Sequence, residues 1–82
     1  MQINPKSLGL ALGIIAGAWW FLIMTVSLLT GIADMTITMV GGFHPFFSYS
    51  WIGMIVIVVE HLIGGFIFGW VFGWLYNKML NR

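Results

Sequence analysis

Two long apolar stretches, separated by a more polar segment, dominate the pattern of hydrophobic and polar positions. Residues 8–30 contain no charged side chain, and residues 51–76 contain one, Glu60. A helix needs about 20 apolar residues to cross the hydrocarbon core of a bilayer, so each stretch is long enough. Neither stretch alternates between apolar and polar residues as barrel strands do. The pattern therefore predicts an all-α hairpin of two transmembrane helices in one domain, residues 1–82.

Residues at the ends of the stretches support these limits. Asn4 followed by Pro5 is a typical helix start, and Ser50 can cap the second helix. Asn77 and the basic residues of the tail, residues 77–82, are expected to close that helix.

The segment between the spans, residues 31–50, is expected to be an interfacial loop. Within it, residues 34–41 predict a short helix that Asp34 caps and Gly41 ends.

Composition supports a membrane protein. The chain is 61% hydrophobic and only 6% charged, whereas a soluble domain carries about 25% charged residues. A water-soluble globule is therefore excluded, and the lipid bilayer is the expected partner. The net charge of +1 is too small for a nucleic-acid-binding surface. The chain has no cysteine, so a disulfide framework is excluded.

The few basic residues predict an orientation. Lys6 precedes the first span, Lys78 and Arg82 follow the second, and the loop has no Lys or Arg. Because Lys and Arg are retained on the cytoplasmic side, both termini are expected inside and the loop outside. Aromatic residues, which favour membrane interfaces, are expected at the outer side (Tyr49, Trp51) and the inner side (Trp70, Trp74, Tyr76).

Two tryptophans do not fit these belts. Trp19 and Trp20 fall near the middle of the membrane and are expected to pack against another helix.

A cleaved signal peptide is the alternative interpretation of the first stretch, because Gly31-Ile32-Ala33 resembles a cleavage site. Signal peptides have apolar regions of about 7–15 residues after a basic segment. This stretch is longer, and one Lys precedes it, so a retained helix is favoured.

Each span carries glycines four residues apart, which fall on one helix face. In lipid, such faces let two backbones approach closely. In an antiparallel hairpin the two series lie at the same depth, which predicts glycine-zipper packing. The pattern leaves open whether the zipper joins helices of one chain or of neighbouring chains. The packing glycines are Gly9, Gly13, Gly17, Gly65, Gly69 and Gly73.

Glu60 is the candidate functional residue. At about 100° per residue it faces away from the glycine series of its own helix. An ionisable group in hydrocarbon costs about 2.5–3.5 kcal/mol on insertion scales, so it is expected to face a bundle interior or a cavity. The sequence therefore predicts a homo-oligomer with Glu60 at a second interface or in a central pathway. A hydrogen bond to Thr25 or to a neighbour's backbone is the structural alternative. His61 and Ser27 are the other polar candidates in the spans.

The loop offers weak metal-binding candidates. Met35, Met39 and His44 could bind a soft metal such as copper(I). Met35 and Met39, four residues apart, also fit the apolar face of an interfacial helix, which is the simpler interpretation. No cofactor is predicted. No nucleophile–base pair or phosphate-binding loop is present, so an enzyme is not expected.

Two segments resemble a family of small bacterial two-span membrane proteins of unknown function, often labelled "bacteriophage holin". These are residues 1–14 and residues 60–70, followed by Leu75-Tyr76-Asn77. The family similarly has an acid shortly before a Gly-Gly pair, here Glu60 before Gly64-Gly65. It also tends to have an aromatic-Pro element in the loop, from which His44 departs. The resemblance implies the hairpin architecture and the bacterial cytoplasmic (inner) membrane, but no mechanism.

Two other hairpin families are less similar. The rotor c-subunit of ATP synthases has a glycine series and a mid-helix carboxylate, but the basic-polar-Pro loop it needs is missing here. Two-span phage holins share the topology but usually end in a more strongly charged tail.

The sequence thus predicts a homo-oligomeric channel or pore with Glu60 as a cation or proton site. The alternatives are a non-conducting structural or accessory subunit of a larger membrane complex and a holin-like membrane permeabiliser.

Overall fold

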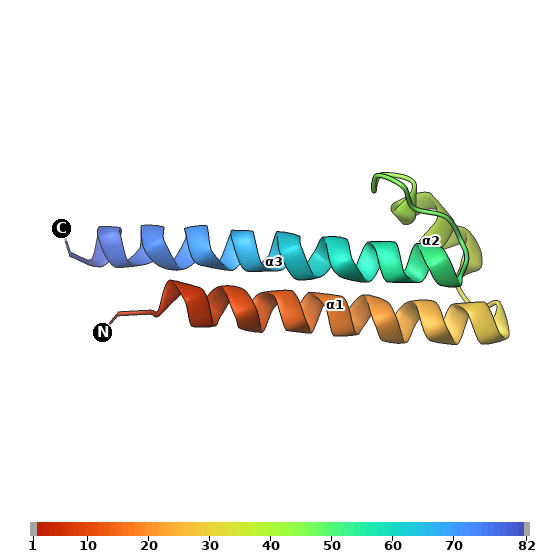
Figure 1. Cartoon of the computed structure of the whole chain (residues 1–82), viewed down its shortest axis with the longest axis horizontal. Coiled ribbons are helices and arrows are strands. Elements are labelled where there is room, and N and C mark those ends of the chain that lie inside the picture. Colours follow the sequence, from red (N-terminus) through yellow and green to blue (C-terminus); the bar gives the residue numbers. More distant parts are fainter. Residues whose placement is uncertain (1, 82) are drawn as a thin grey trace.

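A computed structural model describes residues 2–81 and shows a helical hairpin (Figure 1). Helices α1 (Pro5–Thr30) and α3 (Trp51–Leu80) run antiparallel and side by side, and α2 (Asp34–Gly41) lies at their connected end. Both termini lie at the opposite end (Figure 1). The molecule measures 50 × 19 × 18 Å. The described chain is all-helical, as predicted.

Helices α1 and α3 are each long and apolar enough to cross a membrane. Few of their residues are buried inside the chain, whereas the core helix of a soluble protein buries its apolar face. These two helices therefore suggest a membrane protein.

The predicted helix starts are confirmed. The Asn4 side chain accepts a hydrogen bond from the Ser7 N–H at 3.2 Å, with Pro5 in the first turn of α1. The Ser50 hydroxyl accepts one from the Gly53 N–H at 3.1 Å. At the other end of α1, Gly31 adopts a left-handed conformation with a φ of 79°, which glycine allows without a steric penalty.

The second long helix ends within residues 77–82, the tail that is expected to close it, and Lys78 lies in its last turn. Helix α3 continues through Asn77 to Leu80. The Asn77 side-chain amide is hydrogen-bonded to the backbone of Ile3, in the extended segment before α1. It accepts a hydrogen bond from the Ile3 N–H at 2.8 Å and donates one to the Ile3 carbonyl at 2.6 Å. Arg82, which the orientation prediction used, lies outside the described residues.

Helix α2 has the predicted bounds but not the predicted cap. The residue before it, Ala33, is left-handed with a φ of 61° and provides no side-chain cap. Asp34 is already helical, and its carboxylate accepts a hydrogen bond from the next residue, Met35, at 2.8 Å. Gly41 is the last helical residue, and Gly42 caps the helix.

The glycine series of α1 and α3 face each other within the same chain. A Cβ added to Gly65 would lie 2.6 Å from the Gly13 Cα, and one added to Gly69 would lie 2.6 Å from the Gly9 Cα. Real Cβ atoms essentially never come closer than 3.0 Å to another heavy atom. The two backbones are thus in direct contact over these two turns.

The contact is looser at both ends of the two series. A Cβ on Gly17 would meet the Leu62 side chain at 2.9 Å, and one on Gly73 would meet the Pro5 Cα at 3.0 Å. Side chains rather than bare backbone separate the helices near Gly17.

A small core closes the connected end of the hairpin. It consists of Met24 from α1, Ile37 from α2, and Met54 and Ile57 from α3, and all four are buried. Beside it the buried Ser27 hydroxyl is hydrogen-bonded to the Tyr49 hydroxyl. Helix α2 is thereby anchored to the hairpin by one apolar side chain and by the loop that follows it.

That loop, residues 42–50, runs back over α3. A Cβ on Gly53 would overlap the carbonyl oxygen of Ser48, so the loop backbone lies directly on this helix. Similarly, the Phe47 ring fills the space where Gly41 lacks a side chain. The loop therefore covers Gly53, which lies on the helix face that carries Glu60.

Candidate functional site

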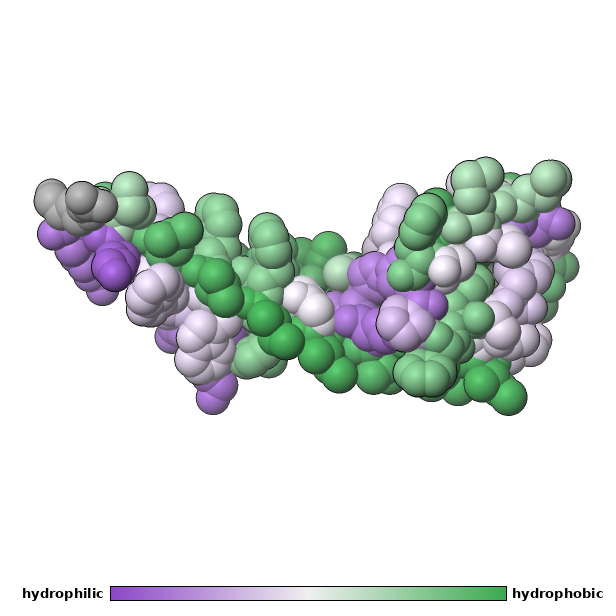
Figure 2. Space-filling model, turned by 90° about the horizontal axis from the view of Figure 1, so that it is seen from above, coloured by the Kyte–Doolittle hydropathy of each residue, from purple (hydrophilic) through white to green (hydrophobic). Residues whose placement is uncertain are grey.

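A groove that contains three polar side chains lies part-way along the hairpin, where the loop meets the two long helices. It has a volume of about 410 Å³. Seen from the side of the loop, a hydrophilic patch lies part-way along the molecule between hydrophobic surfaces, apart from the hydrophilic area at the end that carries the termini (Figure 2). The groove is lined by Leu12 and Ala16 of α1, His44 of the loop, and Glu60, His61, Gly64, Gly65 and Phe68 of α3.

Two histidines, distant in the sequence, form the centre of this site. The ring centroids of His44 and His61 are 5.0 Å apart. His61 Nδ1 lies 2.9 Å from the Ile57 carbonyl, and His44 Nδ1 lies 3.2 Å from the Val40 carbonyl. Because a carbonyl oxygen only accepts, each Nδ1 carries the proton and donates it. In the neutral imidazole with this tautomer, Nε2 is the nitrogen that carries the lone pair.

Trp20 completes the cluster from α1. Its ring centroid is 5.2 Å from that of His61 and 5.9 Å from that of His44. Trp20 therefore packs against another helix, as predicted, because His61 belongs to α3. The Trp19 side chain is 63% exposed in the single chain, so its packing against another helix stays a prediction.

Glu60 is half-buried at the edge of the groove. Its Oε1 is buried and has no hydrogen-bond partner within residues 2–81. The structural alternative raised from the sequence, a bond to Thr25, does not form, because the Thr25 hydroxyl donates to the Met54 sulfur at 3.5 Å. The other polar candidate, Ser27, is bonded to Tyr49. The structure therefore brings Glu60 and His61 together with His44, and leaves Thr25 and Ser27 in the core region.

The three candidate metal ligands of the loop do not come together. Met35 and Met39 are 80% and 70% exposed and line a hollow with Tyr49, whereas His44 turns towards His61. A soft-metal site made of these three residues is therefore wrong. Nor does the described part of the chain place three or more His, Asp or Glu side chains so that they could share a metal ion.

The expected interfacial aromatics occupy both ends of the hairpin. Trp51 starts α3 and is about half exposed, while Tyr49 points inward to Ser27. At the other end the Lys78 Nζ lies 5.1 Å from the centroid of the Trp74 ring. Trp70 and Tyr76 are exposed nearby on α3.

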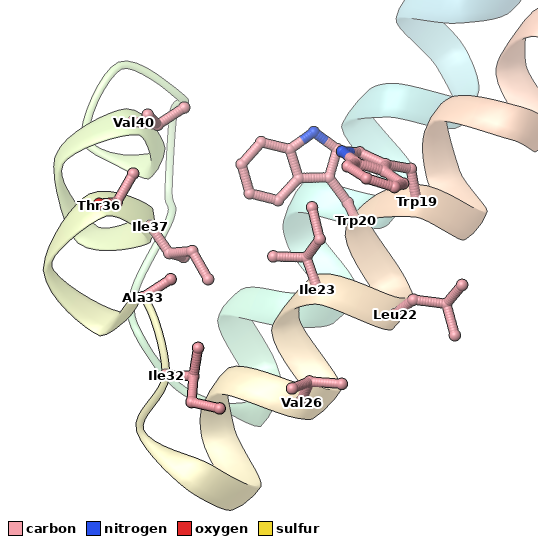
Figure 3. Close-up of a pocket in the computed structure, with 10 residues that line it drawn as sticks. All are labelled: Trp19, Trp20, Leu22, Ile23, Val26, Ile32, Ala33, Thr36, Ile37 and Val40. Atoms are coloured by element: carbon pink, nitrogen blue, oxygen red, sulfur yellow. The ribbon is translucent and has the colours of Figure 1, made fainter.

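A second, larger cavity lies between α1 and α2, with a volume of about 580 Å³ (Figure 3). Its walls are almost entirely apolar. Figure 3 shows side chains of both helices directed towards the space between them, with the two tryptophans at one end. The lining residues are Trp19, Trp20, Leu22, Ile23, Val26, Ile32, Ala33, Thr36, Ile37 and Val40.

Comparisons with known proteins identify no relative: the chain matches no protein-family model, no curated protein and no solved structure. Fold and site define the chain only as a hairpin of two helices of membrane-spanning length, with a Glu–His–His groove on one side.

Proposed function

We propose that the chain is a small membrane channel that assembles from several copies, with the groove of each copy facing a shared cation or proton pathway. The observation that carries this proposal is the buried, unpartnered Oε1 of Glu60 beside two imidazoles. Ionisable side chains inside membrane segments are costly, and they usually face a bundle interior or a water-filled path.

The surface distribution supports the same arrangement. Large exposed side chains elsewhere on α1 and α3 are apolar and suit contact with lipid, for example Ile14, Leu22, Ile55 and Ile63. The groove is the exception. If copies surround an axis with their grooves inward, the polar groups are enclosed and the apolar faces remain outside. A ring of carboxylates in such a pathway would select cations.

The glycine contacts serve as a zipper within each copy in this proposal. They fix α3 against α1, and hence the position of Glu60 relative to the groove. The membrane is the bacterial cytoplasmic membrane, as the family resemblance implies. Both termini are cytoplasmic, which is supported by their location at one end together with the exposed Lys6 and Lys78 (Figure 1).

Two linked measurements test the proposal. Native mass spectrometry of the chain in nanodiscs is expected to give one defined oligomer. Currents of that oligomer in planar bilayers are expected to lose cation selectivity in Glu60→Gln, which keeps the shape of the side chain and removes its charge. Asp34→Asn is the matched control, because it removes the other carboxylate, at the start of α2. A monomer without currents, or identical selectivity in both variants, would overturn the channel.

A non-conducting accessory subunit is the second candidate, and the apolar cavity between α1 and α2 favours it. A helix of a larger membrane complex could fill that space. This function predicts a purified chain that is monomeric or polydisperse on its own. A holin-like permeabiliser would instead kill cells abruptly on expression and release a co-expressed cytoplasmic enzyme.

A further inference from the structure

We propose that His44 and His61 bind one divalent transition-metal ion, of the Zn²⁺ type, through their two Nε2 atoms. This goes beyond the proposed channel and does not depend on conduction. It rests on three features: the Nδ1 hydrogen bonds of the two rings, the separation of the rings, and their contact with Trp20.

The hydrogen-bond pattern of the two rings is the one that metal-binding histidines usually show. A ligating imidazole uses one nitrogen for the metal and usually donates the other N–H to a carboxylate or a backbone carbonyl, which fixes the ring and the tautomer. Both rings do this here, through Nδ1 to Val40 and to Ile57. These hydrogen bonds leave Nε2 of each ring as the nitrogen that can bind a metal, and imidazole nitrogen is a common ligand of Zn²⁺.

The separation of the rings also fits one shared ion. With Zn–N bonds of about 2.0–2.1 Å and a tetrahedral angle, the centroids of two ligating imidazoles lie about 5 Å apart. The observed separation is 5.0 Å. The two residues come from different elements, the loop and α3. An ion would therefore fasten the loop to the helix.

The surroundings define what kind of site this is. Two side chains supply two ligands, and the groove of about 410 Å³ leaves room for water at the other positions. Glu60 is adjacent to His61 in the sequence, so on a helix it points about 100° away and is not counted as a ligand. Trp20 lies against both rings and can attract a cation through its π-system. We therefore expect an open, exchangeable site rather than a closed structural one.

The first test uses Co²⁺, whose visible absorption reports coordination by nitrogen, and the untagged chain in mild detergent. The wild-type protein is expected to develop saturable visible bands at one Co²⁺ per chain that Zn²⁺ competes away. His44→Gln and His61→Gln are each expected to weaken binding about tenfold or more, because each removes one of the two protein ligands. The double variant Met35→Leu/Met39→Leu is the control, because both side chains lie outside the groove, and it should bind within about twofold of wild type. Binding that survives either histidine substitution, or that is lost with the methionines, would overturn the proposal.

A second measurement needs no substitution and so covers the case in which a histidine variant does not fold. The chain has only two histidines, so ¹⁵N-histidine labelling reports on this site alone. Zn²⁺ is expected to shift the Nε2 resonances of both residues while both Nδ1 atoms stay protonated. A shift at one histidine only, or at Nδ1, would refute the shared site. Metal binding by a chain that passes no current would leave this site intact while overturning the channel.

Discussion

The close contact between α1 and α3 gives a sharp prediction, because two adjacent glycines of α3 differ in what surrounds them. A Cβ at Gly65 would lie 2.6 Å from the Gly13 Cα and 2.8 Å from its nitrogen. A Cβ at Gly64 would have nothing within 4 Å. Both sites have the same secondary structure and nearly the same membrane depth. Gly65→Ala is therefore the perturbation and Gly64→Ala is its matched control.

The magnitude follows from the geometry. The atoms opposite Gly65 belong to backbone, which cannot rotate away, so the helices must separate by roughly 1 Å to reach ordinary contact distances of about 3.5–4.0 Å. Such a gap forfeits about a quarter to a half of each pairwise dispersion energy along the contact. Overpacking of this kind typically costs about 1–3 kcal/mol. That range corresponds to roughly a 5- to 150-fold loss in the ratio of folded to unfolded protein, since about 1.4 kcal/mol is a factor of ten.

The assay is equilibrium unfolding in mixed micelles, followed by the fluorescence of the tryptophans and by far-UV circular dichroism. Any gain in helix propensity from replacing glycine by alanine is common to both variants and cancels in their difference. We expect Gly65→Ala to be less stable than Gly64→Ala by about 1–3 kcal/mol. Equal stabilities would refute the argument that the backbone contact at Gly65 holds the hairpin together.

Two further predictions concern polar contacts. Asn77→Leu removes both hydrogen bonds to Ile3 and should lower the stability of this contact by about 1–3 kcal/mol. The measurement is amide hydrogen exchange, which should become faster at Ile3 and change little in the middle of the helices. Unchanged exchange at Ile3 would contradict the prediction. Tyr49→Phe leaves the buried Ser27 hydroxyl without this partner and should cost about 1–2 kcal/mol in the same unfolding assay, whereas Tyr49→Phe combined with Ser27→Ala should recover most of that loss.

Much of the hairpin could be predicted from the sequence, because local chemistry determines it. The length of the apolar stretches, the caps at Asn4 and Ser50 and the bounds of α2 all depend on residues near in the chain. The exact last residue of α3 could not be predicted from local signals. Asn77 is a residue that often ends helices. Its side-chain amide is instead hydrogen-bonded to Ile3, 74 residues away in the sequence, and the helix continues past Asn77.

Only part of the candidate site could be predicted from the sequence. Glu60 and His61 are conspicuous because polar residues are rare in such a span. His44 and Trp20 are not, because their roles depend on how the loop folds back over α3. Two signals were available. The aromatic and apolar residues around His44-Pro45 make a buried position for His44 possible. Trp20 lies too far along its helix to belong to an aromatic belt at the membrane interface. Neither signal gives the direction in which the loop turns.

The position of the loop also changes the reasoning about assembly. On the helical wheel, Glu60 lacks a partner and a second copy is the simplest way to cover it. In the structure, the loop already covers part of that face, since its backbone lies on Gly53 and His44 lines the groove beside Glu60. In the proposed assembly, the shared pathway would therefore form at the open side of the groove, next to Gly64 and Phe68, rather than over the whole Glu60 face. Because the loop and α3 each supply one imidazole, a metal ion held between them would fix the loop and hence the width of that opening.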